Sequence, residues 1–130
     1  MTPTIRRAFL VASAAIAFAL PLTNFASDAS SKDEIDNLLN FVAASSCTFI
    51  RNGTEYPSDK ARDHLASKYQ FAGSRITTAE EFIRYLATES SMSGEPYHVR
   101  CGKTEGLSGV WLTTELKRYR KESARAQAAR

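Results

Sequence analysis

Cys47-Thr48-Phe49-Ile50-Arg51-Asn52-Gly53 is the stretch that decides the fold. Its β-branched and aromatic residues favour a strand, and Asn-Gly is the dipeptide that best tolerates the positive φ angles of a type I′ turn. The sequence therefore predicts a short hairpin over residues 48–56. Farther along, Tyr97-His98-Val99-Arg100-Cys101 alternates in the manner of another strand, which would lie beside the Phe49 strand if Cys47 and Cys101 pair.

Four segments outside these strands carry a start signal and apolar residues at helical spacing. The clearest start signal is the capping box, in which a Ser or Thr and a Glu three residues later satisfy free backbone N–H groups. Ser31 with Glu34 fits this pattern, and so do two overlapping pairs within residues 77–81. The predicted helices run from Ser31 to about residue 45, from Pro57 to about Tyr69, from Thr77 to about Thr88, and from a capping Ser108 through Tyr119.

Residues 1–29 are predicted to be a cleaved export signal. Arg6 and Arg7 supply a basic start, an apolar run ends beside Pro21, and Ser27-Asp28-Ala29 offers small residues for cleavage. The apolar run of about 15 residues is shorter than the roughly 20 that a membrane-spanning helix needs. We therefore expect a periplasmic or secreted protein whose mature form has no transmembrane anchor. General secretory and twin-arginine export both remain open.

Residues 30–120 are expected to form a single small globular domain, because a chain of this length can bury one core. No internal repeat is visible in the sequence. Of the 17 Lys and Arg residues, two lie in the export segment, whereas all 14 acidic residues lie beyond Ala26, so cleavage near Ser27 lowers the net charge from +3 to about +1.

The remaining positive charge gathers near the C-terminus. Residues 121–130 form a basic, Ala-rich tail that we expect to be frayed. Such a tail could touch anionic lipid, but a solvated helix end, where cations favour the helix dipole, is the simpler interpretation. No nucleic-acid partner is expected.

Cys47 and Cys101 are the two cysteines of the chain. In an oxidising compartment pairing is the default, although a metal pair or a reactive thiol are the competing interpretations. His64 and His98 show no zinc-type spacing relative to the cysteines, so no metal and no cofactor is expected. The predicted fold class is therefore α+β and mainly helical, with about four helices, an antiparallel element of two or three strands, and one disulfide.

Many polar positions at fixed spacing resemble a known family. The similarity covers about residues 33–120 and identifies the chain as similar to the YfeK-like family of small exported bacterial proteins, a domain of unknown function. The resemblance implies export and a small disulfide-compatible fold, but no activity, cofactor or catalytic residues. The basic tail after Tyr119 is its one departure. The positions that carry it are Arg51-Asn52-Gly53, Tyr56, Ala61, His64, Leu65, Lys68, Tyr69, Ala79-Glu80, Phe82-Ile83, Ala87-Thr88, Ser90-Ser91, Ser93-Gly94 and Tyr97.

No motif in the chain names a reaction. A nucleophilic serine in the loop of residues 90–93, acting with a histidine, would make a small hydrolase of an envelope polymer, but no G-x-S-x-G or S-x-x-K pattern supports this alternative. Whether the protein is an enzyme stays open, and a non-enzymatic binding or envelope-interaction module is favoured. Its partner would be an envelope protein or an anionic cell-wall or lipid ligand. A polar pocket for an anion is predicted from the hydroxyl and cationic residues Arg51, His64, Lys68, Arg84, Ser90, Ser91, Ser93, Tyr97 and Arg100.

Overall fold

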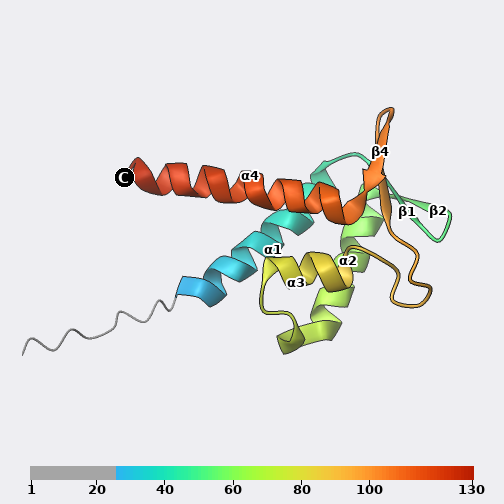
Figure 1. Ribbon diagram of the computed structural model, residues 1–130, viewed down its shortest axis with the longest axis horizontal. Coiled ribbons are helices and arrows are strands. Elements are labelled where there is room, and N and C mark those ends of the chain that lie inside the picture. Colours follow the sequence, from blue (N-terminus) through green and yellow to red (C-terminus); the bar gives the residue numbers. More distant parts are fainter. Residues whose placement is uncertain (1–25) are drawn as a thin grey trace, which may run out of the picture.

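The computed structural model describes residues 26–130, and most of the predicted export signal therefore lies outside the described residues (Figure 1). A single antiparallel sheet stands at one end of a group of helices. The elements follow the order α1 (Ala26–Ala44), β1 (Thr48–Arg51), β2 (Thr54–Pro57), α2 (Ser58–Ala72), η1 (Gly73–Arg75), α3 (Ala79–Glu81), η2 (Phe82–Leu86), β3 (His98–Cys101), β4 (Thr104–Leu107) and α4 (Ser108–Ala128).

The sheet has the strand order β2-β1-β3-β4, with every neighbouring pair antiparallel. Phe49 lies opposite Tyr56 on one side and opposite Val99 on the other. The turn residues Asn52 and Gly53 have φ angles of 49° and 75°, as a type I′ turn requires. The predicted hairpin and its neighbouring strand are thus confirmed.

The sheet contains four strands rather than the two or three predicted. The missed strand is β4, whose sequence Thr-Glu-Gly-Leu is exposed along its whole length and includes a glycine. An edge strand of this kind has neither an apolar alternation nor a buried face, so its sequence carries no strand signal. The predicted fold class, α+β and mainly helical with one disulfide, is otherwise confirmed.

A disulfide joins Cys47, just before β1, to Cys101 at the end of β3, with an S–S distance of 2.03 Å and a sequence separation of 54. The bridge extends the ladder in which Thr48 pairs with Arg100. It therefore locks together the two central strands, which come from distant parts of the chain.

The core lies between the sheet and the helices. Side chains alternate between the faces of a strand, so Phe49 and Val99 share the face that is buried against the helices. Trp111 of α4 packs on Phe41 of α1, with ring centroids 4.4 Å apart, and on Phe49 at 5.5 Å. The core is completed by Ile35, Leu38, Leu39, Val42, Leu65, Ile76, Phe82, Ile83, Leu86, Leu112 and Leu116.

Two predicted helix starts are wrong. Helix α1 begins at Ala26, so Ser31 lies inside it, and the buried Glu34 forms an ion pair with Arg120 of α4 instead of a capping box. At the start of α4 the capping position is occupied by Leu107, because β4 runs directly into the helix and places Ser108 in the first turn. By contrast, the capping box of Thr78 and Glu81 is confirmed.

Helix α3 continues directly into η2, which is a π-helical turn. Helix α4 continues to Ala128, and its last turns project beyond the body of the protein (Figure 1). Among residues 26–130, none of the helices combines the length and apolarity that crossing a bilayer demands.

Candidate functional site

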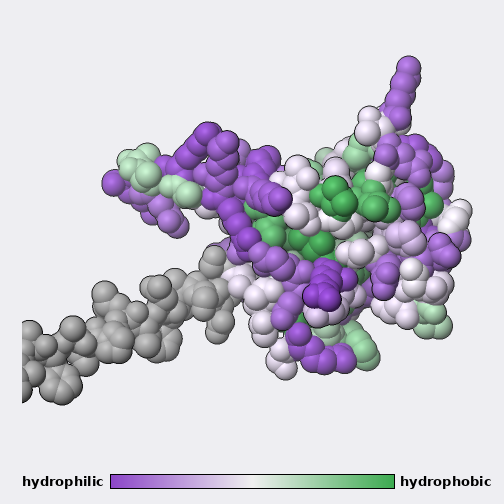
Figure 2. Space-filling view, viewed as in Figure 1, coloured by the Kyte–Doolittle hydropathy of each residue, from purple (hydrophilic) through white to green (hydrophobic). Residues whose placement is uncertain are grey.

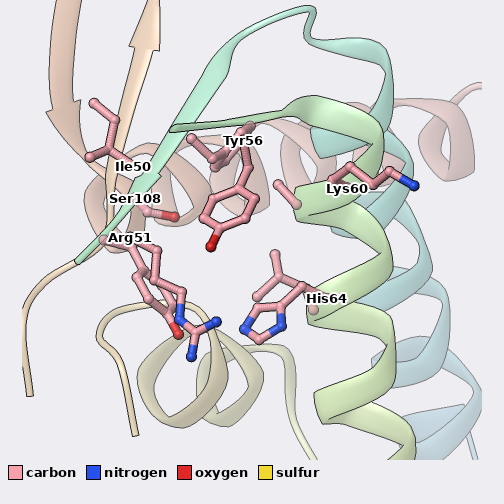
Figure 3. Close-up of a pocket in the computed structure, with 10 residues that line it drawn as sticks. Ile50, Arg51, Tyr56, Lys60, His64 and Ser108 are labelled. Atoms are coloured by element: carbon pink, nitrogen blue, oxygen red, sulfur yellow. The ribbon is translucent and has the colours of Figure 1, made fainter. Parts of the chain in front are cut away.

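A cavity of about 370 Å³ lies between the β1–β2 hairpin and helix α2 (Figure 3). This volume falls within the range typical of small-molecule sites. The described lining contains three side chains that carry positive charge or can take it up, Arg51, Lys60 and His64, and no acidic one. The remaining lining residues are Phe49, Ile50, Tyr56, Ala61, Leu65, Tyr97 and Ser108.

Arg51 and His64 reach toward each other from β1 and α2 (Figure 3). Arg51 is brought to this face because it follows Phe49 by two positions, and residues two apart on a strand share a face. Arg51 Nε and His64 Nε2 are both buried, and neither has a hydrogen-bond partner within the described part of the chain. Such groups carry an uncompensated desolvation cost, which makes the end of the cavity lined by Arg51 and His64 a candidate site for a polar group of a ligand.

Positive charges crowd this end of the cavity. Burial lowers the pKa of His64, and the nearby charges of Arg51 and Lys68 lower it further. The pKa of Lys68 is also lowered, first by burial and then by Arg51. Because the cations destabilise one another, the local potential favours an anion.

The π-helical turn η2 fixes Lys68. The ammonium group donates to the backbone carbonyl of Leu86, the last residue of that turn, at 2.7 Å, and to the Tyr97 hydroxyl at 3.4 Å. Burial raises the pKa of Tyr97, an effect that the neighbouring Arg51 and Ser90 oppose. Tyr97 therefore stays a neutral hydroxyl in the cavity wall, with Lys68 held behind it.

The hairpin turn is tied to the serine loop. Asn52 Nδ2 donates to the buried Ser90 Oγ at 3.4 Å, and Asn52 Oδ1 accepts from Ser93 Oγ at 2.6 Å. The loop is closed by its own backbone bonds, including Gly94 N–H to the Ser90 carbonyl at 2.8 Å. These contacts hold β1 and the loop before Tyr97 in one fixed arrangement.

Five of the nine residues predicted for the anion pocket come together in the structure. They are Arg51, His64, Lys68, Ser90 and Tyr97, of which Ser90 supports the site through Asn52 and Tyr97.

The other four predicted residues lie elsewhere, which corrects the predicted pocket. Arg100 lies opposite Thr48, so it points to the other face of the sheet and bonds Glu55 at 2.7 Å. Arg84 is exposed and lies over the ring of Tyr85. Ser91 is exposed, and Ser93 bonds Asn52 at the surface.

Several cavity residues were not predicted to line a pocket, notably Phe49, Tyr56, Ala61 and Ser108. A signal for one of them was present. A two-residue turn at Asn52-Gly53 fixes the hairpin register and pairs Tyr56 with Phe49, which places Tyr56 on the same face as Arg51.

A second hollow of about 650 Å³ runs between η2 and α4. Figure 2 shows an apolar patch at the base of α4 and hydrophilic side chains along its projecting end. Ile83, Leu107 and Val110 contribute to the lining of this hollow, and Arg84 lies at its side. Within residues 26–130 no three His, Cys, Asp or Glu side chains gather in a way that could hold a metal ion.

Together these features define a small α+β domain with one disulfide and a cationic cavity that has apolar walls. Residues 29–120 match the model of a family of unknown function, DUF5329, and the chain belongs to that family. It is 36% identical over 89 residues to the uncharacterized protein YfeK of Salmonella typhimurium (strain LT2), a match that covers 67% of this chain and 74% of that protein. The family resemblance noted from the sequence is thus confirmed. No solved structure matches the chain.

Proposed function

We propose that this protein is a non-enzymatic binding module that holds a small anionic ligand in the cavity between the β1–β2 hairpin and α2. The observation that carries the proposal is that Arg51 and His64, each with a buried nitrogen that has no hydrogen-bond partner, line one cavity. Arginine is well suited to this role because its planar guanidinium matches the oxygens of carboxylates and phosphates.

A bound anion would reduce three unfavourable free-energy terms of the empty cavity, namely two unpaired polar groups and the repulsion between cations. It would accept hydrogen bonds from Arg51 and from His64 when the His64 proton is on Nε2. It would also offset the repulsion that lowers the pKa values of His64 and Lys68. The absence of an acidic side chain from the described lining leaves that position to a ligand.

We place this activity outside the cytoplasm. The support for an exported location is the basic, apolar and small-residue pattern of residues 1–29. Anionic groups are common there on cell-wall fragments and lipid headgroups, and either could supply the ligand.

The hydrolase alternative gains no support from the serine loop. A nucleophilic serine needs a base within hydrogen-bond reach. Ser90 and Ser93 are instead bonded to Asn52, and Ser91 is exposed. No hydrogen bond links a serine of this loop to a histidine within the described residues.

Isothermal titration of the exported protein with phosphate, acetate, hexanoate and 3-phenylpropionate tests the proposal. We expect at least one anion to bind, and Arg51→Met to weaken it at least tenfold. Arg100→Met is the matched control, because this arginine also lies on a central strand but on the opposite face, paired with Glu55. Binding that survives in Arg51→Met, or a failure of every anion to bind, would overturn the proposal.

A further inference from the structure

The cavity is much larger than the group that its polar end can recognise. At about 370 Å³, it has room for several times the volume of a small inorganic anion, since one water occupies about 30 Å³ in the liquid. An inorganic phosphate at Arg51 and His64 would leave most of the space without contacts. The shape of the site therefore calls for a ligand with a body as well as a charged head.

The walls around that body are apolar. Phe49, Ala61 and Leu65 are 7%, 9% and 4% exposed, and each contributes to the lining. Tyr56 adds an aromatic ring, and its hydroxyl points toward the end where Arg51 and His64 meet (Figure 3). A ligand with a second charge or a sugar-like body would bind weakly against such walls, because its polar groups would be left without hydrogen-bond partners.

The polar end matches a head with two acceptor oxygens. The side chains of Arg51 and His64 come from different elements, β1 and α2, so a head bound between them should present an acceptor to each. A carboxylate supplies two oxygens and a single negative charge. The charge of Lys60 is carried away from the cavity centre in Figure 3, which leaves Arg51 as the cation of the lining that directly faces the head.

From these observations we infer that the ligand is a monocarboxylic acid with a compact apolar body, an aliphatic chain or a single aromatic ring. This inference rests on the proposed function, which concerns anion binding alone. It adds that the apolar body, rather than the charge, supplies most of the affinity.

A chain-length series tests the inference by titration calorimetry with acetate, butyrate, hexanoate and 3-phenylpropionate. Each added methylene that enters the cavity should tighten binding about fourfold, until the space is filled and the gain stops. Inorganic phosphate should bind no better than acetate. Hexanamide, which keeps the body but lacks the charge, should bind at least tenfold more weakly than hexanoate.

A smaller cavity should alter this series in a specific way. Ala61→Leu places extra volume against the apolar wall, so the longer acids should lose affinity while acetate keeps its own. Ala44→Leu, at an exposed position at the end of α1, is the matched control. The series on the unaltered protein gives an independent answer if Ala61→Leu does not fold.

The outcomes separate the two proposals. If phosphate binds through Arg51 and longer acids bind no more tightly than acetate, the acid-with-body inference is wrong and the anion-binding function stands. If hexanamide binds as well as hexanoate, the carboxylate head is wrong. If no anion in the series binds, both proposals fail.

Discussion

Two regions of the molecule have the same order of two strands and a helix, but they differ in the side chains at matching positions. The unit β1-β2-α2 begins at Thr48, and the unit β3-β4-α4 begins at His98. In each, two strands of four residues flank a two-residue turn, and a helix begins at the next residue. Since β1 and β3 pair antiparallel at the centre of the sheet, with Phe49 opposite Val99, the strands of the two units are arranged about an approximate two-fold axis. The repetition is visible in the structure although it was not visible in the sequence.

The difference lies in side-chain volume at matching positions. The fourth residue of α2 is Ala61, whereas the fourth residue of α4 is Trp111. Trp111 packs against Phe41 of α1 and Phe49 of β1, so a large ring occupies this position in the second unit. Ala61 leaves the cavity open beneath the other. The cavity is therefore a consequence of residue choice and not of the topology.

The two units also differ in whether their buried charged side chains have partners. In the second unit Glu115 is 4% exposed, accepts from Asn37 at 3.1 Å and forms an ion pair with Arg118. In the first unit Arg51 and His64 have buried nitrogens without partners. A satisfied buried charge serves the fold, whereas two buried nitrogens without partners beside a cavity support the proposed ligand.

Separating the two units should have the largest effect on stability. Replacing both cysteines, Cys47→Ser with Cys101→Ser, removes the bridge between β1 and β3. For a loop of 54 residues, the chain-entropy model gives a loss of about 4 kcal/mol in the free energy of unfolding. Urea unfolding measures it. A loss below about 1 kcal/mol would mean that the sheet and core hold the units together without the bridge.

Emptying the filled unit should cost more than enlarging the open one. Trp111→Ala should lower the free energy of unfolding by about 3 kcal/mol, because it removes an aromatic packed on two others. Tyr56→Ala, in the wall of the existing cavity, should cost about 1 kcal/mol, since that ring is only partly buried. Equal losses in urea unfolding would contradict the difference between the units.

Removing the buried charge of Glu115 in the second unit should lower the free energy of unfolding. Glu115→Gln weakens the contact with Arg118 and should cost about 2 kcal/mol, a value reduced from that of a fully buried pair because Arg118 is half-exposed. Glu122→Gln is the matched control. Glu122 pairs with the same arginine but is exposed, so its loss should cost less than about 0.5 kcal/mol. Denaturant midpoints of the two variants decide the matter.

Removing the charge of Arg51 in the first unit should have the opposite effect and raise the free energy of unfolding. Arg51→Met replaces a buried, unpartnered N–H with an apolar group of similar length, and should raise the free energy of unfolding by about 1 kcal/mol. Arg100→Met, on the open face of the sheet, should change it by less than about 0.5 kcal/mol. A destabilised Arg51→Met would show that the guanidinium serves the fold, and thermal melting without ligand measures this.

The sequence predicted the elements better than the site because local patterns encode elements. The Asn52-Gly53 turn, the box at Thr78 and the pairing of Cys47 with Cys101 all follow from rules that act within a few residues or from one covalent bond. Strand β4 was missed because an exposed edge strand needs no pattern of its own.

The site depends on longer-range geometry. Arg100 was predicted to join Arg51, but the antiparallel register that pairs Phe49 with Val99 sends the two arginines to opposite faces. That face assignment follows only once the register of β1 against β3 is known. The cavity itself reflects missing volume at Ala61, which no residue type announces in a sequence.

Lowering the pH should destabilise the two units over two separate pH ranges. Both effects on the free energy of unfolding should be small. In the folded protein the pKa of His64 is lowered from 6.5 by burial, Arg51 and Lys68, so the unfolded chain binds the proton more readily. Stability from this unit is therefore complete above about pH 6.5 and falls as the pH drops below it. In the second unit the pKa of Glu115 is lowered from 4.5, chiefly by its hydrogen bond from Arg118, so its contribution is lost only below about pH 4.5.

The first window should disappear in His64→Gln and persist in His98→Gln, since His98 lies on the open face of the sheet beside Glu105. Urea midpoints at pH 7.0 and 5.5 measure the difference. In the unaltered protein, a bound carboxylic acid should narrow this window, because a negative charge beside His64 raises its pKa toward the ordinary value. If His64→Gln loses as much stability between pH 7.0 and 5.5 as the unaltered protein does, another group causes the loss. In that case the titration of His64 does not distinguish the two units.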